Sequence, residues 1–555
     1  MRRHLVTLGI LTVLLLVGCA KVVVPTGGPK DMEPPKMQKE DPPALTVNFK
    51  APQIKIAFDE FFTLQNPTEN VLISPPMSTS PKYSISGKNL IIKFTDTLQP
   101  NTTYNMVFSD CIRDYNEGNP IPYYHYSFST GPVIDSCTIK GSVRDALTLD
   151  ACKDYFVMLY KKDVDSLPLT TLPDYITKSQ SNGNFNLDNI APGFYKIFAL
   201  KDINANLLYD LPNERVAFSD GLVEAAVIVS PKDSTRQVDI QEVQLLSFEQ
   251  APENPQLAHV ENPAAGVFIL PYMKPVSEFS AEALGQNIPY FERFNESRDT
   301  IFWYMKEAIA DTLSYRLHAD GHTDTLTITP YKEVKLNGRG SSRNERKSVL
   351  NVTARNQGHR FKPLSLAFSY PIRPADSIAA TFISRKDTQT VYVSVPDSFV
   401  MQLPIPFSYS DKQSYTLIIP DSVFWGYNNL TNDSIRLNFE TRSLKDYGNL
   451  TMEYVCPETG GNFIAQLWKD KTLIQQDMFT NTCKIPYLYL DPGNYRIKVI
   501  EDLNGNGHWD PGNYSLHLQP ERVFFFHTDV TIRAYWDSEE QFRIGEIRDG
   551  GDMRR

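Results

Sequence analysis

Hydrophobic and polar residues alternate with a period of two over much of the chain. Ile54–Asp59 (Ile-Lys-Ile-Ala-Phe-Asp) and Leu364–Ser369 (Leu-Ser-Leu-Ala-Phe-Ser) are two examples. This alternation places apolar side chains on one face of a β-strand. Turn-forming residues interrupt the pattern about every 8–12 residues, which is typical of β-sandwiches. The pattern therefore predicts an all-β protein.

Two stretches of the chain are near-copies of each other. Identical residues recur 300 positions later at Pro192, Gly193, Tyr195, Ile197, Asp202, Asn204, Asn206, Asp210 and Asn213. After a seven-residue insertion, Glu214–Val216 recurs as Glu521–Val523. A fixed repeat distance indicates duplicated units, so we expect two copies of one domain.

A looser pair of similar segments precedes the two copies. Asn101–Tyr104 in the first corresponds to Gln413–Leu417 in the second, and Tyr104 has the position of a tyrosine that pins a sandwich corner. Residues 251–345 carry short strand patterns of their own. We therefore expect a string of about five sandwiches, at residues 46–134, 135–250, 251–345, 346–445 and 446–555.

The first residues have the pattern of an export signal. Arg2 and Arg3 precede an apolar run, Leu5–Val17, of 13 residues, whereas a membrane span needs about 20. Leu16–Cys19 resembles a bacterial lipobox, which predicts a signal peptide over residues 1–18 and acylation of Cys19, for example with palmitate. The alternative is an ordinary signal peptide with a chance cysteine. A Pro-rich tether is expected over residues 19–45.

The sequence after the cleavage site bears on localisation. Ala20 and Lys21 do not resemble the Asp-type signal that retains lipoproteins in the inner membrane. We therefore expect a lipid-anchored outer-membrane protein, with the periplasmic and cell-surface faces both open.

Composition narrows the classes of function. The chain has 39 Pro against 28 Gly, and Pro disfavours long helices. Its formal charge is −10, and removal of Arg2 and Arg3 with the signal peptide makes it −12. A negative chain is unsuited to sequence-independent binding of nucleic acid, so no nucleic-acid partner is expected.

Several short motifs together resemble a known family. They are Cys19, Pro25–Asp31, Phe58–Glu60, Ile73–Pro76, Pro100–Tyr104 and Asn116–Pro120. They resemble Bacteroidetes lipoproteins with an N-terminal Ig-like domain of the S-layer-protein (SbsA, Big_5) type. The copied domain, with Gly141–Asp145 and Gly183–Leu187 before Pro192, resembles the carboxypeptidase regulatory-like, transthyretin (prealbumin)-type sandwich. The resemblance implies a cell-envelope lipoprotein without catalysis and without a defined ligand.

The clearest chemical motif lies in the second copy. Asp502, Asn504, Asn506 and Asp510 occupy positions 1, 3, 5 and 9 of a calcium-type loop. The backbone carbonyl of His508 would fill position 7, and Gly507 stands at position 6. Position 12 is Asn513 rather than Glu, so the loop resembles those of sandwich repeats in surface adhesins and not an EF-hand. Glu501 or Glu521 would complete the shell.

The first copy carries a weaker version of this motif. It comprises Asp202, Asn204, Asn206, Asp210 and, as a further ligand, Glu214, with Leu207 where the second copy has glycine. Ca²⁺ in either loop would be structural, and no other cofactor is expected. The alternative is an Asx-rich turn that is held by its own backbone hydrogen bonds.

Five cysteines follow Cys19. Cys137 and Cys152 fall in the first copy and Cys456 and Cys483 in the second, so each copy offers one candidate disulfide in an exported protein. Cys111 is left over and is expected to be buried.

Other motifs argue against catalysis. His318–Asp324 contains an Asp-Gly pair typical of a hairpin turn, and metal binding there is the less favoured interpretation. Lys335–Lys347 reads as a basic linker, with contact to anionic lipid or glycan as the alternative. The chain lacks the Gly-x-Ser-x-Gly, His-Glu-x-x-His and Ser-x-x-Lys motifs, and we expect no enzyme activity.

Three functions remain open. The first is a structural or protein-interaction role in the envelope. The second is a glycan- or adhesin-type binding protein, with Tyr123, Tyr124, Tyr126 and Trp303 as candidate exposed aromatics, although the alternating pattern places most of them in the core. The third is an accessory role in outer-membrane protein assembly or export. The expected partners are the membrane, through the lipid, and an envelope protein or a glycan.

Overall fold

The computed structural model describes residues 31–545 except for 122–123, 230–235, 240, 296, 308, 332–348, 374, 397 and 459. The predicted signal peptide, Cys19, Tyr123 and the whole basic linker Lys335–Lys347 lie outside the described residues. Nearly all regular structure is β, as the alternating pattern predicts. Among the described residues, no helix has the length and apolar character that crossing a bilayer requires.

The first module contains β1 to β9 and one helical turn, α2 (Pro67–Asn70). One sheet has the order β1 (Met37–Asp41), β2 (Gln53–Phe58), β6 (Asn89–Lys93), β5 (Lys82–Ser86). The facing sheet is β4 (Leu72–Ser74), β7 (Thr103–Val107), β9 (His125–Ser129), and β3 (Phe62–Leu64) pairs with β8 (Ile112–Asp114). Apolar residues of both sheets, such as Ile54 and Phe128, are fully buried between them.

Strand β1 lies inside the segment expected to be a tether. Its residues pair antiparallel with β2, so the first module begins before residue 46. The side chains of Met37–Asp41 are almost all exposed. An edge strand can be held by its backbone alone, which is why no hydrophobic alternation revealed it.

The second module contains β10 to β18. Its strands are β10 (Cys137–Asp145), β11 (Phe156–Tyr160), β12 (Tyr175–Lys178), β13 (Asn184–Ile190), β14 (Gly193–Lys201), β15 (Arg215–Phe218), β16 (Val223–Val229), β17 (Arg236–Asp239) and β18 (Gln241–Glu249), with α3 (Leu167–Thr170) after β11. The main path is β12-β11-β14-β15-β18-β10-β13, and β10 and β18 run parallel.

The fifth module repeats these pairings. Its strands are β33 (Gly448–Val455), β34 (Phe463–Lys469), β35 (Thr472–Phe479), β36 (Cys483–Leu490), β37 (Gly493–Glu501), β38 (Val523–Phe525), β39 (Val530–Ile532) and β40 (Asp537–Arg543). β33 and β40 run parallel as β10 and β18 do, and β37 pairs with β34, β38 and β39 as β14 pairs with β11, β15 and β16. The two repeated sequences therefore fold with one topology.

The third and fourth modules are two-sheet sandwiches. The third pairs β19 (Glu261–Ala264), β20 (Val267–Pro271), β23 (Thr300–Met305) and β22 (Tyr290–Phe294) over β21 (Phe279–Ala283), β24 (Leu313–Ala319) and β25 (His322–Ile328). The fourth pairs β26 (Val352–Arg355), β27 (Leu364–Ile372) and β30 (Val400–Ile405) over β29 (Thr388–Val395), β28 (Ala375–Ser384), β31 (Ser414–Ile419) and β32 (Ile435–Glu440). The short helix η1 (Leu444–Asp446) leads into the fifth module.

Equivalent tyrosines pin a corner of the first and fourth modules. The hydroxyl of Tyr104 accepts a hydrogen bond from the backbone N–H of Gln99 at 2.9 Å. The hydroxyl of Tyr415 accepts from the N–H of Ser410 at 3.1 Å. Both bonds span five residues, which supports the correspondence between Asn101–Tyr104 and Gln413–Leu417.

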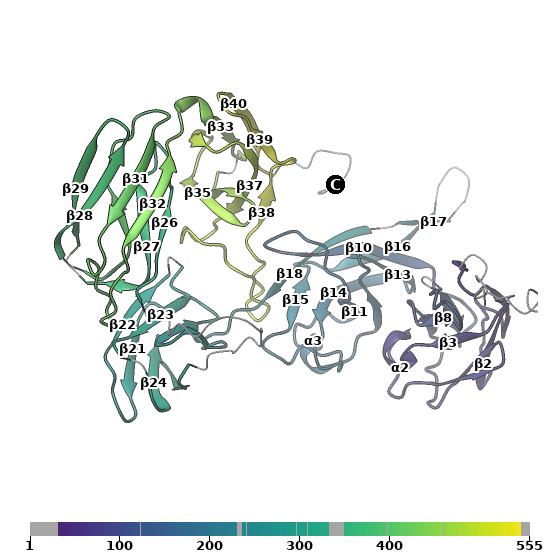
Figure 1. Cartoon of the computed structure of the whole chain (residues 1–555). Helices are drawn as coiled ribbons and strands as arrows, with labels where there is room; N and C mark the ends of the chain where they lie inside the picture. Colours follow the sequence, from purple (N-terminus) through teal and green to yellow (C-terminus); the bar gives the residue numbers. More distant parts are fainter. Residues whose placement is uncertain are drawn as a thin grey trace, which may run out of the picture.

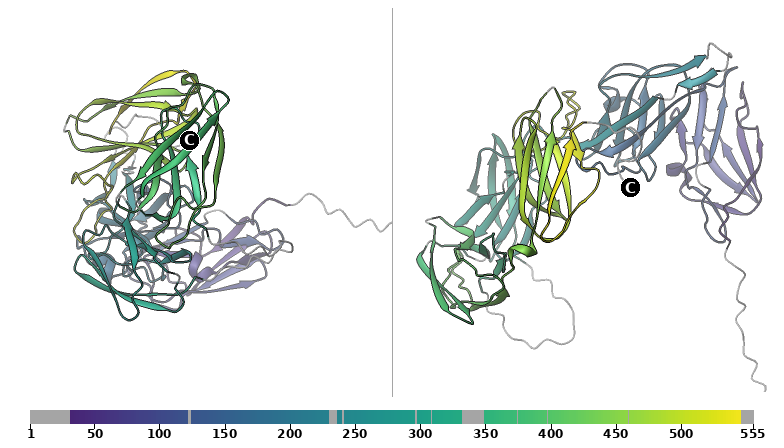
Figure 2. Two further views of the ribbon diagram at one scale, coloured as in Figure 1. Left: turned by 60° about the vertical axis from the view of Figure 1, so that its left-hand side comes forward. Right: turned by 90° about the horizontal axis from the view of Figure 1, so that it is seen from above.

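The second to fifth modules close on one another, as Figures 1 and 2 show, and the first module extends from the second. Third and fourth modules meet where the hydroxyl of Tyr370 donates to the carbonyl of Ala265 at 2.8 Å. Fourth and fifth meet where the N–H of Arg360 donates to the hydroxyl of Tyr447 at 3.0 Å. A long loop of the fifth module then reaches the second module.

The cysteines do not form the disulfide expected in the first copy. The N–H of Cys152 donates to the carbonyl of Val143 at 3.0 Å, and Cys137 lies six residues before Val143 along β10. At about 3.3 Å per residue this separation is roughly 20 Å, too far for a disulfide. All five described cysteines are free thiols, and Cys111 is buried.

The second candidate pair is differently placed. Cys483 pairs with Tyr454 across β33 and β36, and Cys456 follows Tyr454 by two residues. Cys456 directly follows the end of β33 and Cys483 begins the neighbouring strand β36, so the two thiols lie at the same end of this strand pair. A bond between them stays a prediction.

Candidate functional site

The duplicated loops connect β14 to β15 and β37 to β38, and each begins at an aspartate. Asp502 is buried, and its carboxylate accepts the N–H groups of Gly505 at 2.8 Å and Gly507 at 2.9 Å. Asp202 accepts those of Ala205 at 2.7 Å and Leu207 at 2.8 Å. The first residue of each motif thus folds its loop back on itself.

The last aspartate of each motif gathers the two asparagines. Asp510 accepts from the side-chain amides of Asn504 at 2.6 Å and Asn506 at 2.7 Å. Asp210 accepts in the same way from Asn204 at 2.9 Å and Asn206 at 2.7 Å. The structure therefore brings together the side chains that the sequence singled out in both copies. The N–H of His508 donates to the Asn506 side chain at 2.8 Å.

A buried glutamate supports each loop. Glu521 is 3% exposed and accepts from the N–H groups of Leu503 at 2.7 Å and Asp510 at 3.0 Å. Glu214 is fully buried and accepts from Ile203 at 3.0 Å and Asp210 at 3.2 Å. Burial raises the pKa of Glu521 above its usual range. Glu501, the other candidate, instead forms an ion pair with Arg522.

The absence of glycine does not change the shape of the first loop. Gly505 and Gly507 have φ of 72° and 80°, and Ala205 and Leu207 have φ of 60° and 61°. A side chain in this left-handed region costs about 1–2 kcal/mol. The first copy therefore keeps the loop at the expense of local strain.

These loops offer the oxygen types that a hard cation prefers. The same atoms already hold the loop together, because Asp502, Asn504 and Asn506 accept backbone N–H groups and the two amides donate to Asp510. Within the described chain, no group of three or more His, Cys, Asp or Glu side chains is gathered for a metal. The loops thus have the geometry of self-satisfied Asx turns, and Ca²⁺ stays a prediction.

The insertion in the second copy forms a clasp between the copies. We define the clasp as residues 511–520, and its hairpin is closed by reciprocal backbone bonds between Asn513 and Leu518 at 2.7 and 2.9 Å. Tyr514 is 2% exposed. Its ring lies 4.9 Å from that of Phe198 and 5.2 Å from that of Phe218, both in the second module. One aromatic cluster therefore spans the two copies. Figure 1 shows the yellow loop of the fifth module that reaches the second module.

Polar contacts surround this aromatic centre. The N–H and hydroxyl of Tyr514 donate to the Gln250 side chain and the Asp165 carbonyl, both at 2.8 Å. His517 lies 2.6 Å from the Asp165 carboxylate. The side chain of Gln519 donates to the Phe218 carbonyl at 3.0 Å and to Asp220 at 2.8 Å. These contacts fix the orientation of the clasp as well as its position.

The clasp is also continuous with the calcium-type loop. A Cβ on Gly512 would lie 2.6 Å from the ring of Phe248, so only glycine fits there. Trp509 packs against the aromatic cluster around Tyr514 and against a small apolar cluster of Ile464, Ile500 and Val523. Its indole N–H donates to the Glu521 carbonyl at 2.9 Å. Sequence reasoning noted the insertion but missed its role. The signal was its apolar composition, Tyr-Ser-Leu-His-Leu, which is unusual for a solvated loop.

The aromatic residues proposed as a binding face belong to the core. Tyr126 and Trp303 are fully buried, and Tyr124 packs against the core of the first module. These three residues therefore form no exposed binding face, because the alternation that predicts strands also turns their side chains inward, as the sequence pattern indicated for most of them.

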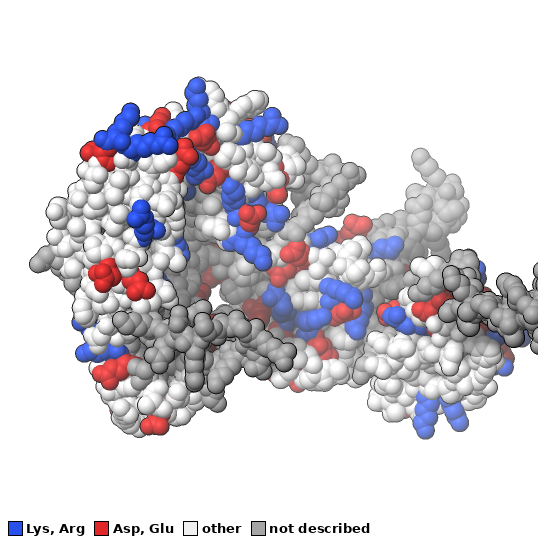
Figure 3. All heavy atoms as spheres, in the orientation of Figure 1, with Lys and Arg blue, Asp and Glu red and all other residues white. Residues whose placement is uncertain are grey.

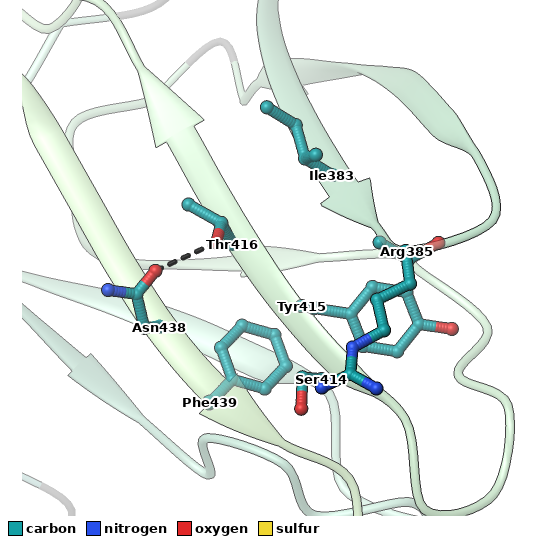
Figure 4. Close-up of a pocket in the computed structure, with 8 residues that line it drawn as sticks. Ile383, Arg385, Ser414, Tyr415, Thr416, Asn438 and Phe439 are labelled. Carbon is teal, nitrogen blue, oxygen red and sulfur yellow. Dashed lines mark hydrogen bonds between the residues drawn. The ribbon is translucent and has the colours of Figure 1, made fainter.

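A shallow hollow of about 550 Å³ opens at one end of the fourth module (Figure 4). Its lining includes Arg385, Ser414, Asn438 and Phe439, and Thr416 donates to Asn438 at 2.7 Å. None of the eight lining residues is a histidine or a carboxylate. The hollow therefore offers hydrogen bonds, one cation and a ring, but no acid–base pair.

Known proteins resemble the chain only distantly. No curated protein matches it. Among solved structures, the N-terminal part of the bacterial S-layer protein SbsC is 15% identical over 37% of this chain and 44% of that chain, with a TM-score of 0.14. The match thus spans less than half of the SbsC fragment.

Two pilins are similar over longer stretches. The major pilin subunit BcpA of Bacillus cereus is 8% identical over 74% of this chain and 99% of that chain, with a TM-score of 0.14. The pilus protein RrgB of Streptococcus pneumoniae is 9% identical over 71% and 94%, with a TM-score of 0.16. TM-scores this low support no argument about function. A family is identified for the first module alone: residues 31–130 match the profile of the bacterial Ig-like domain, Big_5.

Proposed function

We propose that this chain is a non-catalytic lipoprotein of the outer membrane, anchored through Cys19, with a structural and protein-interaction role. The observation that carries the proposal is the clasp, which joins modules nearly 300 residues apart through a buried tyrosine. Such a contact gives the tandem modules one fixed arrangement. A fixed arrangement is what a spacer or docking platform requires.

Other junctions support the same role. Between the first and second modules, Asn105 donates to the Asp188 carbonyl at 2.9 Å and accepts from Asn189 at 2.9 Å. Asn105 is 7% exposed, so this network is removed from water. A satisfied buried polar network fixes relative orientation, because any slip leaves its members unpaired. The junctions between modules therefore fix the relative orientation of the modules as well as holding them together.

The titration of the candidate nucleophiles also favours a non-catalytic role. Burial raises the pKa of the Cys111 thiol to about 11 and raises the pKa of the other four described thiols. Reactive cysteines have a lowered pKa, because the thiolate is the nucleophile. His359, a buried histidine of the fourth module, has a pKa lowered to about 4 by burial. Its imidazole is held neutral by its surroundings, not poised to exchange protons.

The anchor is tested by metabolic labelling with an alkyne analogue of palmitate. We expect label on the wild-type chain and none on Cys19→Ser, which should leave the membrane fraction. Cys456→Ser is the matched control, because it removes a cysteine elsewhere and should stay labelled. Equal labelling of wild type and Cys19→Ser would refute the anchor.

The interaction role is tested by a gentle-detergent pull-down of the tagged chain followed by mass spectrometry. We expect an envelope protein to be recovered with the wild type. Recovery of nothing above background would refute the role, and recovery of a β-barrel assembly or export protein would indicate an accessory function there.

We also propose that the loop at Asp502–Asp510 holds a structural Ca²⁺. Its support is the type and spacing of its oxygens and their link to the clasp through Trp509 and Glu521. In that case the ion would stiffen the segment from which the clasp projects.

A further inference from the structure

An exposed cluster of rings and cations lies where the fourth and fifth modules meet. We call it the junction patch and define it by Phe361, Leu444, Lys445, Tyr489, Arg533, Tyr535 and Trp536. Tyr535 is 68% exposed, Trp536 59% and Leu444 49%. Exposed Trp and Tyr side chains are favoured at binding sites because they offer a large, rigid surface with a polar end.

Contacts between segments make the patch continuous. The N–H of Tyr535 donates to the Tyr447 carbonyl at 2.7 Å. The ring of Tyr447 lies 6.5 Å from that of Tyr489, which stacks on Phe361 at 3.6 Å with an interplanar angle of 12°. Four separate segments of two modules therefore build one surface.

Two of the tyrosines stand where glycine would be easier to accommodate. Tyr535 has φ of 63° and Tyr489 has φ of 55°, in the left-handed region. This conformation is unfavourable for a residue with a Cβ. The chain thus presents an aromatic side chain at each position despite backbone strain, and at Tyr535 that side chain is largely in solvent.

The patch is cationic in a chain that is acidic overall. The ammonium of Lys445 lies 5.4 Å from the ring centre of Tyr535, and the guanidinium of Arg533 lies 5.4 Å from that of Trp536. Three carboxylates lie near the patch: Asp446 accepts from the Ser443 N–H at 2.7 Å, Asp491 pairs with Arg442 at 2.6 Å, and Asp537, which follows Trp536, accepts from the Asn449 side chain at 2.7 Å. Figure 3 shows several Lys and Arg side chains along this end of the two modules, with Asp and Glu side chains among them.

The hollow of Figure 4 opens at the same end of the fourth module. Arg360, beside Phe361, forms an ion pair with Asp411, three residues before Ser414 of the hollow. Arg385 extends its guanidinium toward Ser414 and the ring of Phe439 (Figure 4). Aromatic rings and a cation therefore also line the hollow at this end of the fourth module.

We propose that the junction patch binds an anionic glycan chain. Faces of sugar rings stack on Trp536 and Tyr535, and carboxylate or phosphate groups of the glycan pair with Arg533 and Lys445. This binding goes beyond the structural role and does not depend on it. A bilayer surface is the less suitable occupant, because a flat anionic surface would also face the acidic surroundings of the patch, in a chain whose formal charge without the signal peptide is −12. A slender polymer bound along the patch interacts mainly with Arg533 and Lys445, because charges farther away than about 8 Å are screened by salt.

The test measures binding of the full-length chain, purified in detergent, to alginate, a polymer of uronic acids. Neutral dextran and vesicles of phosphatidylglycerol and phosphatidylethanolamine are the comparison probes. The ring variant is Tyr535→Gly with Trp536→Ala, in which glycine keeps the left-handed backbone. The charge variant is Lys445→Gln with Arg533→Gln. Tyr392→Ala, at a ring 71% exposed on β29, is the matched control.

We expect wild type and Tyr392→Ala to bind alginate equally, and each double variant to bind at least about tenfold more weakly, the usual scale for loss of a dominant contact. Added salt should weaken wild-type binding. The proposal is overturned by absence of alginate binding, by equal binding of dextran, or by equal affinity of all variants. Binding to the vesicles but not to alginate would also overturn it in favour of a lipid partner. Unchanged circular dichroism and melting of the variants exclude misfolding as the cause.

Discussion

Truncation of Tyr514 is expected to uncouple the two copies. The side chain is 2% exposed and lies among Phe198, Phe218 and Phe248, and its hydroxyl donates to the Asp165 carbonyl at 2.8 Å. Replacing a buried aromatic residue by alanine costs about 3–5 kcal/mol. Loss of one hydrogen bond costs about 0.5–1.5 kcal/mol. Tyr514→Ala should therefore lose several times more coupling free energy than Tyr514→Phe.

The assay is urea unfolding followed by tryptophan fluorescence, together with small-angle X-ray scattering. Trp509 is a natural reporter because it packs in the clasp cluster. In the wild type we expect the second and fifth modules to unfold together. In Tyr514→Ala the fluorescence transition of Trp509 should shift to lower urea, and the radius of gyration should increase under native conditions.

The control is Leu516→Ala, in the same hairpin but 66% exposed. It should leave both measurements unchanged, because exposed substitutions seldom move stability by more than about 0.5 kcal/mol. If Tyr514→Ala unfolds and scatters like Leu516→Ala, the clasp does not hold the copies together and the reasoning fails.

Three further predictions concern titration, metal and thiols. Burial lowers the pKa of His359 from 6.5 to about 4. As the pH falls, the unfolded chain therefore binds the proton before the folded chain does. The contribution of His359 to the free energy of unfolding is complete above pH 6.5 and falls by up to roughly 3 kcal/mol as the pH drops to about 4. His359→Gln should flatten this part of a pH–melting curve, and an equal slope in both proteins would contradict the assignment. Calcium should raise the melting temperature over that in chelator, and Asp502→Ala should abolish the difference; no calcium effect on the wild type would remove the site. Mild oxidation should join Cys456 to Cys483 and leave Cys137 and Cys152 free, as peptide mapping under non-reducing conditions would show; a bond between Cys137 and Cys152 would contradict the placement of Cys152 beside Val143.

The alternation of apolar residues was enough to predict sandwiches, and the 300-residue repeat was enough to predict two modules of one topology. Both signals are local or pairwise within the sequence. Tyr104 was also identifiable, because its corner bond reaches only five residues away. In each case the residues that determine the structure are close together in the sequence or belong to a repeated segment.

The features that the sequence did not predict depend on contacts between segments that are far apart in the sequence. The alternating pattern indicates on which face of its strand Phe218 lies. It does not indicate that Tyr514, almost 300 residues later in the sequence, packs against Phe218. Strand β1 is held by backbone pairing, which leaves no apolar pattern. The distance between Cys137 and Cys152 depends on where the segment at Cys152 lies along β10, which spacing in sequence does not reveal. The junction patch draws on four segments, none of which has a motif.

The clasp has a consequence for biogenesis. Tyr514 is synthesised long after Phe218, so the rings of the second module that it contacts stay uncovered until the end of the chain has been made. At a synthesis rate of about 5–20 residues per second, roughly 300 residues correspond to about 15–60 s. During that interval the nascent protein exposes an apolar socket, formed by the rings of Phe198, Phe218 and Phe248. A chaperone that shields aromatic surfaces would therefore be needed most before the final module emerges, and a chain cut short before residue 514 would keep the socket open permanently.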